Sequence, residues 1–161
     1  MKSYHVPVTV IRSNNVYGYN QYEEKLIPMV ISSLSNDKAV TIQGDGHNKR
    51  RYLFIDDFTE AVLTIWKKGE AYEIYNVGSE DEKSNNEIVE MIIDVWGEQN
   101  GKKDVNITYV KDREFNDERY EVDFEKVRRL GWVAKVGLRE GLSRVVRGHR
   151  GSTEVPGPLL K

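Results

Sequence analysis

Cysteine is absent from the 161 residues of this chain. Disulfide bonds and thiolate metal sites are therefore excluded, and a reducing compartment fits the composition. The three histidines, His5, His47 and His149, are scattered along the sequence without the spacing of metal ligands. The sequence accordingly predicts no metal site.

Two nucleotide-binding fingerprints are also missing. The chain has neither a Gly-x-Gly-x-x-Gly turn nor a Walker loop, so it carries no phosphate-cradling motif of its own for a dinucleotide or a nucleoside triphosphate. Ser13 is not flanked by the glycines of a nucleophile elbow. The sequence predicts no catalytic residue.

Long apolar runs and a strong net charge are missing as well. No run approaches the roughly 20 residues that cross a bilayer, and the first ten residues lack the build of a signal peptide. The formal net charge of -2 gives no reason to expect nucleic acid or an anionic membrane as a partner. We expect a cytoplasmic protein that binds neither.

The chain does contain an alternation of strand-like and helical segments. Runs of β-branched residues predict strands at 8–11, 40–42, 52–55, 73–77 and 105–110. Apolar residues at helical spacing predict helices at 24–34, 56–68, 84–96, 123–130 and 138–146. This alternation places the chain in the α/β class. We expect one ordered unit over 1–147 and a disordered tail over 148–161, which has no apolar periodicity.

The expected helices carry recognisable ends. Asp56 and Asp57 precede the second helix as its cap, and Trp66 is expected on its buried face. Ser84 and Glu87 have the spacing of a capping box at the start of the third helix, which Gly97 is expected to end.

Polar side chains gather in four loops, around Asn14, Arg50, Asn85 and Arg113. Each loop follows a strand or opens a helix, and such positions can converge on one crevice in an α/β protein. Two arginines with amides between them suit a diphosphate, because guanidinium groups bind phosphate oxygens bidentately. The positive end of the helix that begins near Asn85 would add to this attraction.

Each of these residues also has a purely structural interpretation. Asn14 is a good turn former, and Arg50 sits in a basic cluster that could be a solvated face. Asn85 could be part of a helix cap, and Arg113 lies among acidic residues that could form a surface salt-bridge network. From the residues alone, these alternatives stay open.

An ordered series of motifs runs from Lys2 to Val146. It contains RSNNVYG at 12–18, EKLIP at 24–28, GDG at 44–46 before Arg50, YNVG at 75–78, and NDERY at 116–120. In this order the motifs resemble the C-terminal half of nucleotide-sugar 4,6-dehydratases, which are extended short-chain dehydrogenase/reductases that act on dTDP-glucose or UDP-glucose. EKLIP and the Asn-Asp-x-Arg-Tyr motif favour dehydratases over the related 4-epimerases.

The resemblance implies site residues. Asn14 would lie in the diphosphate region, and Thr41 and Gln43 would flank the base. The full set of implied substrate-binding residues is Asn14, Lys25, Leu26, Thr41, Gln43, Arg50, Asn85, Arg113 and Asn116. Ser13 corresponds to a residue whose backbone approaches the nicotinamide of NAD.

The resemblance also implies a missing part. The family's NAD turn, its Tyr-x-x-x-Lys pair and its acid/base carboxylates all precede the segment present here. We therefore expect the substrate-binding portion of an extended Rossmann-type fold that lacks the dinucleotide-binding half, as a truncated product or a partial gene model that is inactive alone. The complete enzyme would use NAD, act as a homodimer, and give a 4-keto-6-deoxy sugar nucleotide.

Three other interpretations stand against this hypothesis. The chain could be a non-catalytic nucleotide-sugar-binding module, or belong to a related epimerase or decarboxylase. It could also be a remnant that binds no ligand, in which case the exposed strand at 8–11 would need a partner or self-association.

Overall fold

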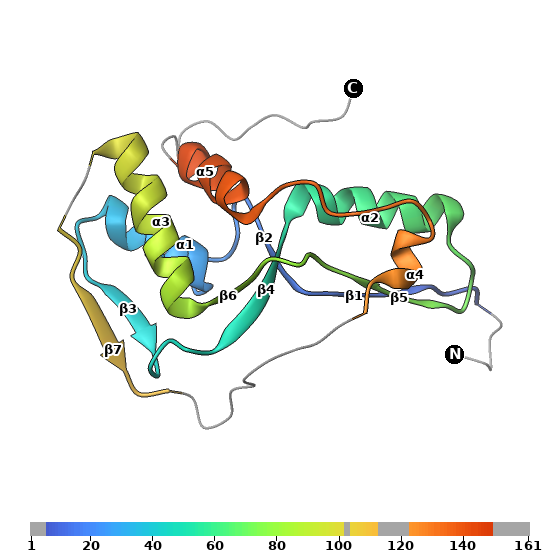
Figure 1. Ribbon diagram of the computed structural model, residues 1–161, viewed down its shortest axis with the longest axis horizontal. Coiled ribbons are helices and arrows are strands. Elements are labelled where there is room, and N and C mark those ends of the chain that lie inside the picture. The colour runs from blue at the N-terminus through green and yellow to red at the C-terminus, as the bar shows by residue number, and fades with distance from the viewer. Residues whose placement is uncertain (1–5, 102–103, 113–122, 150–161) are drawn as a thin grey trace.

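The computed structural model describes residues 6–101, 104–112 and 123–149 (Figure 1). Predicted site residues Arg113 and Asn116 lie outside these ranges, as does 150–161 of the expected tail. The elements are β1 (Val10–Ser13), β2 (Asn15–Tyr17), α1 (Leu26–Ser35), β3 (Val40–Gln43), β4 (Lys49–Phe54), α2 (Ile55–Lys68), β5 (Ile74–Val77), β6 (Glu82–Ser84), α3 (Asn85–Asn100), β7 (Ile107–Val110), α4 (Glu125–Arg128) and α5 (Leu138–His149).

Parallel pairing dominates the sheets. β1 pairs with β5, β2 with β4, and β3 with β7, all in parallel, while β6 joins β4 antiparallel. Parallel neighbours need crossover connections, and here helices make them: α1 and α2 lie between strands along the chain. This arrangement confirms the α/β class.

The molecule is elongated and has two apolar cores. We call the first the helical end, where α1, α3 and α5 pack together beside β3 and β7 (Figure 1, left). Its core includes Val30, Ile42, Ile88, Ile92 and Leu142, each at most 1% exposed. The predicted helical spacing of apolar residues produces this core, because residues three and four apart share one helix face.

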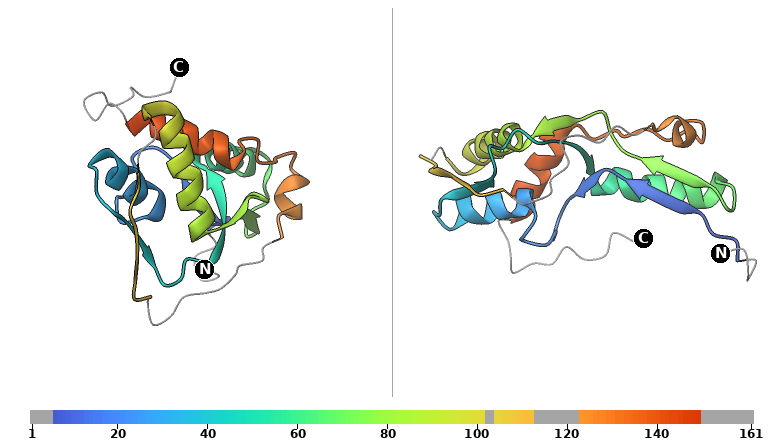
Figure 2. Two further views of the ribbon diagram at one scale, coloured as in Figure 1. Left: turned by 60° about the vertical axis from the view of Figure 1, so that its left-hand side comes forward. Right: turned by 90° about the horizontal axis from the view of Figure 1, so that it is seen from below.

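We call the second the β1–β5 end, which comprises β1, β5, α2 and α4. Figure 2 (right) shows α2 lying along the β1–β5 ladder. Leu53, Ala61, Tyr75, Phe124 and Val127 are buried between these elements. Tyr75 and Val77 alternate with Ile74 and Asn76 along β5, so only one face of the strand contributes to the core.

Asp57 does not cap α2, contrary to the expectation from sequence. The helix begins at Ile55 and its N-cap residue, Phe54, makes no side-chain cap bond. The Asp57 side chain is 3% exposed, and its Oδ2 accepts hydrogen bonds from the backbone N–H groups of Lys135 at 3.0 Å and Val136 at 2.9 Å. Asp57 therefore holds the segment that leads into α5.

Other expected boundaries also need correction. Trp66 is 79% exposed and not on the buried face of α2. α3 continues through Gly97 to Asn100 and ends at Gly101, whose φ of 90° favours glycine. β1 begins two residues later than predicted, and α5 extends to His149, past the expected end of the ordered unit. The three-residue strands β2 and β6 were not predicted.

Candidate functional site

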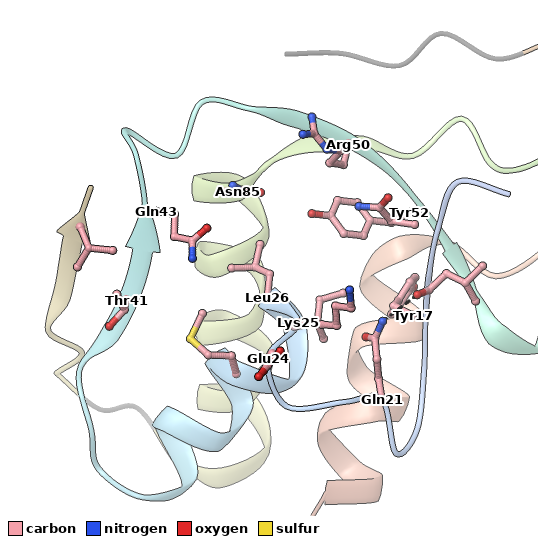
Figure 3. A pocket seen from close by; sticks show the side chains of 15 residues that line it. Tyr17, Gln21, Glu24, Lys25, Leu26, Thr41, Gln43, Arg50, Tyr52 and Asn85 are labelled. Carbon is pink, nitrogen blue, oxygen red and sulfur yellow. Dashed lines mark hydrogen bonds between the residues drawn. The ribbon is translucent and has the colours of Figure 1, made fainter. Parts of the chain in front are cut away.

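A cavity of about 610 Å³ opens between β4, β3, α1 and the start of α3 (Figure 3). Its volume falls within the range of small-molecule sites. The lining residues are Asn15, Val16, Tyr17, Gln21, Glu24, Lys25, Leu26, Ile27, Met29, Thr41, Gln43, Arg50, Tyr52, Asn85 and Val110.

Six of the nine predicted substrate-binding residues line this one cavity. They are Lys25, Leu26, Thr41, Gln43, Arg50 and Asn85. Lys25 is the N-cap residue of α1, and Asn85 is the first residue of α3. Thr41 and Gln43 face the same side of β3 because they are two residues apart on a strand. The structure brings the six together, and their roles with a ligand stay predictions.

Asn14 and Ser13 do not line the cavity. Asn14 follows β1, and a Cβ at Gly78 would lie 1.7 Å from its Oδ1, so glycine is needed at position 78 for this close approach. The Oδ1 atom is buried and has no hydrogen-bond partner within the described ranges. The neighbouring Asn15 turns to the cavity instead, because successive residues of an extended chain point to opposite sides.

The two cationic side chains of the cavity differ in their surroundings. Arg50 lies at the rim (Figure 3), and its Nη1 donates a hydrogen bond to the Lys49 carbonyl oxygen at 2.7 Å. The Lys25 side chain extends into the cavity from the start of α1 (Figure 3). A ligand anion could therefore contact Lys25 inside the cavity and Arg50 at its rim, since a guanidinium has five N–H donors.

The start of α3 has fewer donors to offer than the sequence suggested. Ser84 and Glu87 form the predicted capping box. The backbone N–H of Asn85 donates to the Asn48 carbonyl oxygen, and that of Asn86 donates to the Gly46 carbonyl oxygen. These backbone donors are already used within the protein. Asn85 is thus left with its side-chain amide as the group that can contact a ligand.

Glu87 adds a negative charge beside this helix start. Its carboxylate accepts a hydrogen bond from the Lys83 ammonium at 2.8 Å and from the Ser84 backbone N–H at 2.8 Å. The Lys83 ammonium, followed by the Ser84 N–H, lowers the pKa of Glu87 to about 2. Glu87 is thus ionised and paired with Lys83 beside the helix start, and the cations that line the cavity itself are Lys25 and Arg50.

Sequence reasoning missed two tyrosines of the cavity wall. Tyr17 and Tyr52 are 2% and 5% exposed, and their rings meet edge to face with centroids 6.3 Å apart. Burial raises the pKa of both hydroxyls, that of Tyr52 to about 12. The two-residue repeat of side chains along a strand could have identified Tyr52. It lies two residues after Arg50 on β4, just as Gln43 lies two residues after Thr41 on β3.

Two other features are not found in the part of the chain that the structure describes. No group of three or more His, Asp or Glu side chains could hold a metal ion there. No helix there is long and apolar enough to cross a membrane. Ser13, for which the resemblance implied a backbone approach to NAD, is exposed and does not line this cavity, and Asn14 is packed against Gly78.

Comparison with known proteins gives a consistent family match. Residues 1–145 match the family model described as GDP-mannose 4,6 dehydratase. The dTDP-D-glucose 4,6-dehydratase of Homo sapiens is 39% identical in an alignment of 151 residues that covers 92% of this chain and 43% of that protein. A trifunctional protein of Arabidopsis thaliana, whose activities include UDP-glucose 4,6-dehydratase, is 39% identical in an alignment of 163 residues, gaps included, that covers 99% of this chain and 24% of that protein.

A solved structure shares the fold. The dTDP-glucose 4,6-dehydratase from Streptomyces venezuelae with NAD and TYD bound superposes with a TM-score of 0.86 at 32% sequence identity. The match covers 94% of this chain and 46% of that one. The chain thus spans less than half the length of these relatives.

Proposed function

The chain belongs to the GDP-mannose 4,6-dehydratase family, and on this premise we propose that its cavity binds the nucleoside diphosphate of a nucleotide sugar. The observation that carries the proposal is the convergence of Lys25, Arg50 and Asn85 on one cavity from three separate elements. A diphosphate carries negative charge that two cations and an amide can match with charge-assisted hydrogen bonds.

We place the base against β3 and the diphosphate near the start of α1. Thr41 and Gln43 provide hydroxyl and amide groups on one face of β3, and Val110 of β7 adds an apolar contact beside them. Polar edge groups with an apolar neighbour suit a pyrimidine base. Lys25 lies across the cavity, which leaves the phosphates between it and Arg50.

In this proposal the chain provides the nucleotide-sugar-binding part of a dTDP-glucose or UDP-glucose 4,6-dehydratase. The relatives with these activities are about twice its length or longer. NAD supplies the hydride chemistry of such an enzyme when bound. Ser13 and Asn14 lie outside the cavity, and we expect NAD not to bind this chain alone. A homodimeric complete enzyme in the cytoplasm is part of the same proposal.

Calorimetric titration with UDP-glucose and dTDP-glucose tests the proposal. We expect saturable one-to-one binding of at least one of them. Arg50→Ala should weaken it about 10- to 100-fold, because a hydrogen bond to a charged group contributes about 1.5–3 kcal/mol. Arg139→Ala is the matched control, since Arg139 pairs with Glu98 and does not line the cavity. A folded sample that binds neither ligand would overturn the proposal.

A further inference from the structure

We propose that the Tyr52 hydroxyl donates a hydrogen bond to a diphosphate oxygen of the bound ligand. The inference rests on the proposed function and adds a positioning residue that neither the motifs nor the family match assigned. Tyr52 lines the cavity two residues beyond Arg50 on β4, so both side chains leave the same side of the strand.

The Tyr52 ring has a fixed position. The residue lies opposite Asn15 in the β2–β4 pairing, and its backbone N–H donates to the Asp81 carbonyl oxygen at 3.0 Å. Its carbonyl oxygen accepts a hydrogen bond from the Ser79 hydroxyl at 2.5 Å. Edge-to-face contact with Tyr17 limits the ring further. A group held in this way can bind without a large loss of side-chain entropy.

The hydroxyl points into the cavity. Figure 3 shows it directed from β4 toward the side where Leu26 and Asn85 lie. Within the described ranges, no side chain or carbonyl receives its hydrogen bond. Because burial raises the pKa of Tyr52 to about 12, the hydroxyl remains a protonated donor at neutral pH. A fixed donor that faces a polar cavity without a protein acceptor is suited to a ligand acceptor.

The neighbouring charges select an anionic acceptor. Arg50 and Lys25 lie on either side of Tyr52 in the cavity wall (Figure 3). An anion attracted by these two cations would come within reach of the hydroxyl that lies between them. A hydrogen bond to a charged oxygen is also stronger than one to a neutral sugar hydroxyl. The geometry therefore favours the diphosphate over the sugar.

Tyr17 provides an internal comparison. It lines the same cavity, yet its hydroxyl donates to the Leu138 carbonyl oxygen at 3.3 Å. Its hydroxyl therefore serves the contact between β2 and α5, whereas that of Tyr52 has no such partner among the described residues. Tyr17→Phe and Tyr52→Phe remove the same atom from two tyrosines of one cavity wall.

The test compares UDP and UDP-glucose as ligands of the wild type, Tyr52→Phe and Tyr17→Phe by calorimetric titration. Thymidine diphosphate and dTDP-glucose replace them if they bind more tightly. Tyr52→Phe should weaken both ligands by a similar factor, about tenfold or more. Tyr17→Phe should lower the thermal midpoint and weaken binding less than Tyr52→Phe does, because the Tyr17 hydroxyl already donates to the Leu138 carbonyl oxygen. Tyr52→Phe should keep the wild-type midpoint, because its hydroxyl stabilises no described contact.

Each other outcome overturns the inference in a distinguishable way. A loss of affinity for UDP-glucose but not for UDP would move the contact from the diphosphate to the sugar. Unchanged affinity of Tyr52→Phe, alongside weakened binding by Arg50→Ala, would refute the role of Tyr52 and leave the proposed function standing. Failure of the wild type to bind any of these ligands would overturn both proposals.

Discussion

The two ends of the molecule cover their apolar residues to different degrees. At the helical end, three helices pack on one another, and Val30, Ile88, Ile92 and Leu142 are fully buried. At the β1–β5 end, Leu63 and Trp66 of α2 and Ile74 of β5 are 46%, 79% and 42% exposed. The helices of the first end cover one another, and its exposed apolar side chains include those of Tyr109 and Val110 on the edge strand β7, whereas at the second end both a helix and a strand expose apolar side chains.

This difference follows from the sheet architecture. A parallel ladder ordinarily has helices on both faces. β1 pairs only with β5 within the described ranges, and the face of β5 that carries Ile74 is exposed. A two-stranded ladder also leaves unpaired edges. Most residues that line the cavity come from elements other than β1, β5, α2 and α4, so the comparison predicts that ligand binding depends on the better-packed end.

The largest expected effect contrasts one buried and one exposed apolar residue. Ile92→Ala should lower the free energy of unfolding by about 2–5 kcal/mol, because it opens a cavity in the core of the helical end. Trp66→Ala should change it by at most about 0.5 kcal/mol, since the indole is mostly exposed. Urea denaturation measures both. Equal losses of unfolding free energy in the two variants would contradict the difference in packing between the two ends.

A second prediction concerns the hydrogen bonds that connect α2 to the segment before α5. Asp57→Ala should cost about 2–4 kcal/mol, because it leaves the backbone N–H groups of Lys135 and Val136 without their acceptor. Asp56→Ala is the matched control: its carboxylate is exposed and pairs with Arg144 at 3.5 Å, so a loss below about 1 kcal/mol is expected. Thermal unfolding of both variants tests this. If Asp57→Ala lowered the free energy of unfolding no more than Asp56→Ala, the contact between α2 and the segment before α5 would not depend on Asp57.

The smallest effect should appear in acid, at the start of α3. The pKa of Glu87 is lowered from its ordinary 4.5 to about 2, so its carboxylate stabilises the fold above pH 4.5 and this contribution is lost as the pH falls through about 2. Glu87→Gln should flatten the fall of the thermal midpoint between these pH values. Glu90→Gln, an exposed change on the same helix, should leave the wild-type slope. If the thermal midpoint of Glu87→Gln fell with pH as steeply as that of the wild type, the Glu87 carboxylate of the capping box would contribute nothing measurable to stability.

The helices were the most predictable part of the fold. α1, α3 and α5 were found from apolar periodicity, because burial on one face decides both sequence and structure there. The same reasoning failed at Trp66, since periodicity identifies a helix face without showing whether another element covers it. It also failed at Asp57, whose partners are 78 and 79 residues away. No local pattern encodes such a contact.

The cavity was predicted only in part. Arg50 and Asn85 are predicted from polar loops beside strand and helix ends, and Lys25 from the motif at 24–28; the fold brings the three together. Tyr17 and Tyr52 were missed, because aromatic residues in strands ordinarily indicate core. The donors at the start of α3 were overestimated, since the sequence does not reveal that the Asn48 and Gly46 carbonyl groups already occupy them.

Hydrogen exchange measured by mass spectrometry, with and without UDP-glucose or dTDP-glucose, shows which segments the ligand protects. We expect a saturating nucleotide sugar to slow exchange at the start of α1, in β3, in β4 and at the start of α3. We expect no change in β1 and β5, whose amides should exchange faster than those of α3 in both states. Protection confined to β1 and β5, or none anywhere, would contradict the proposed site.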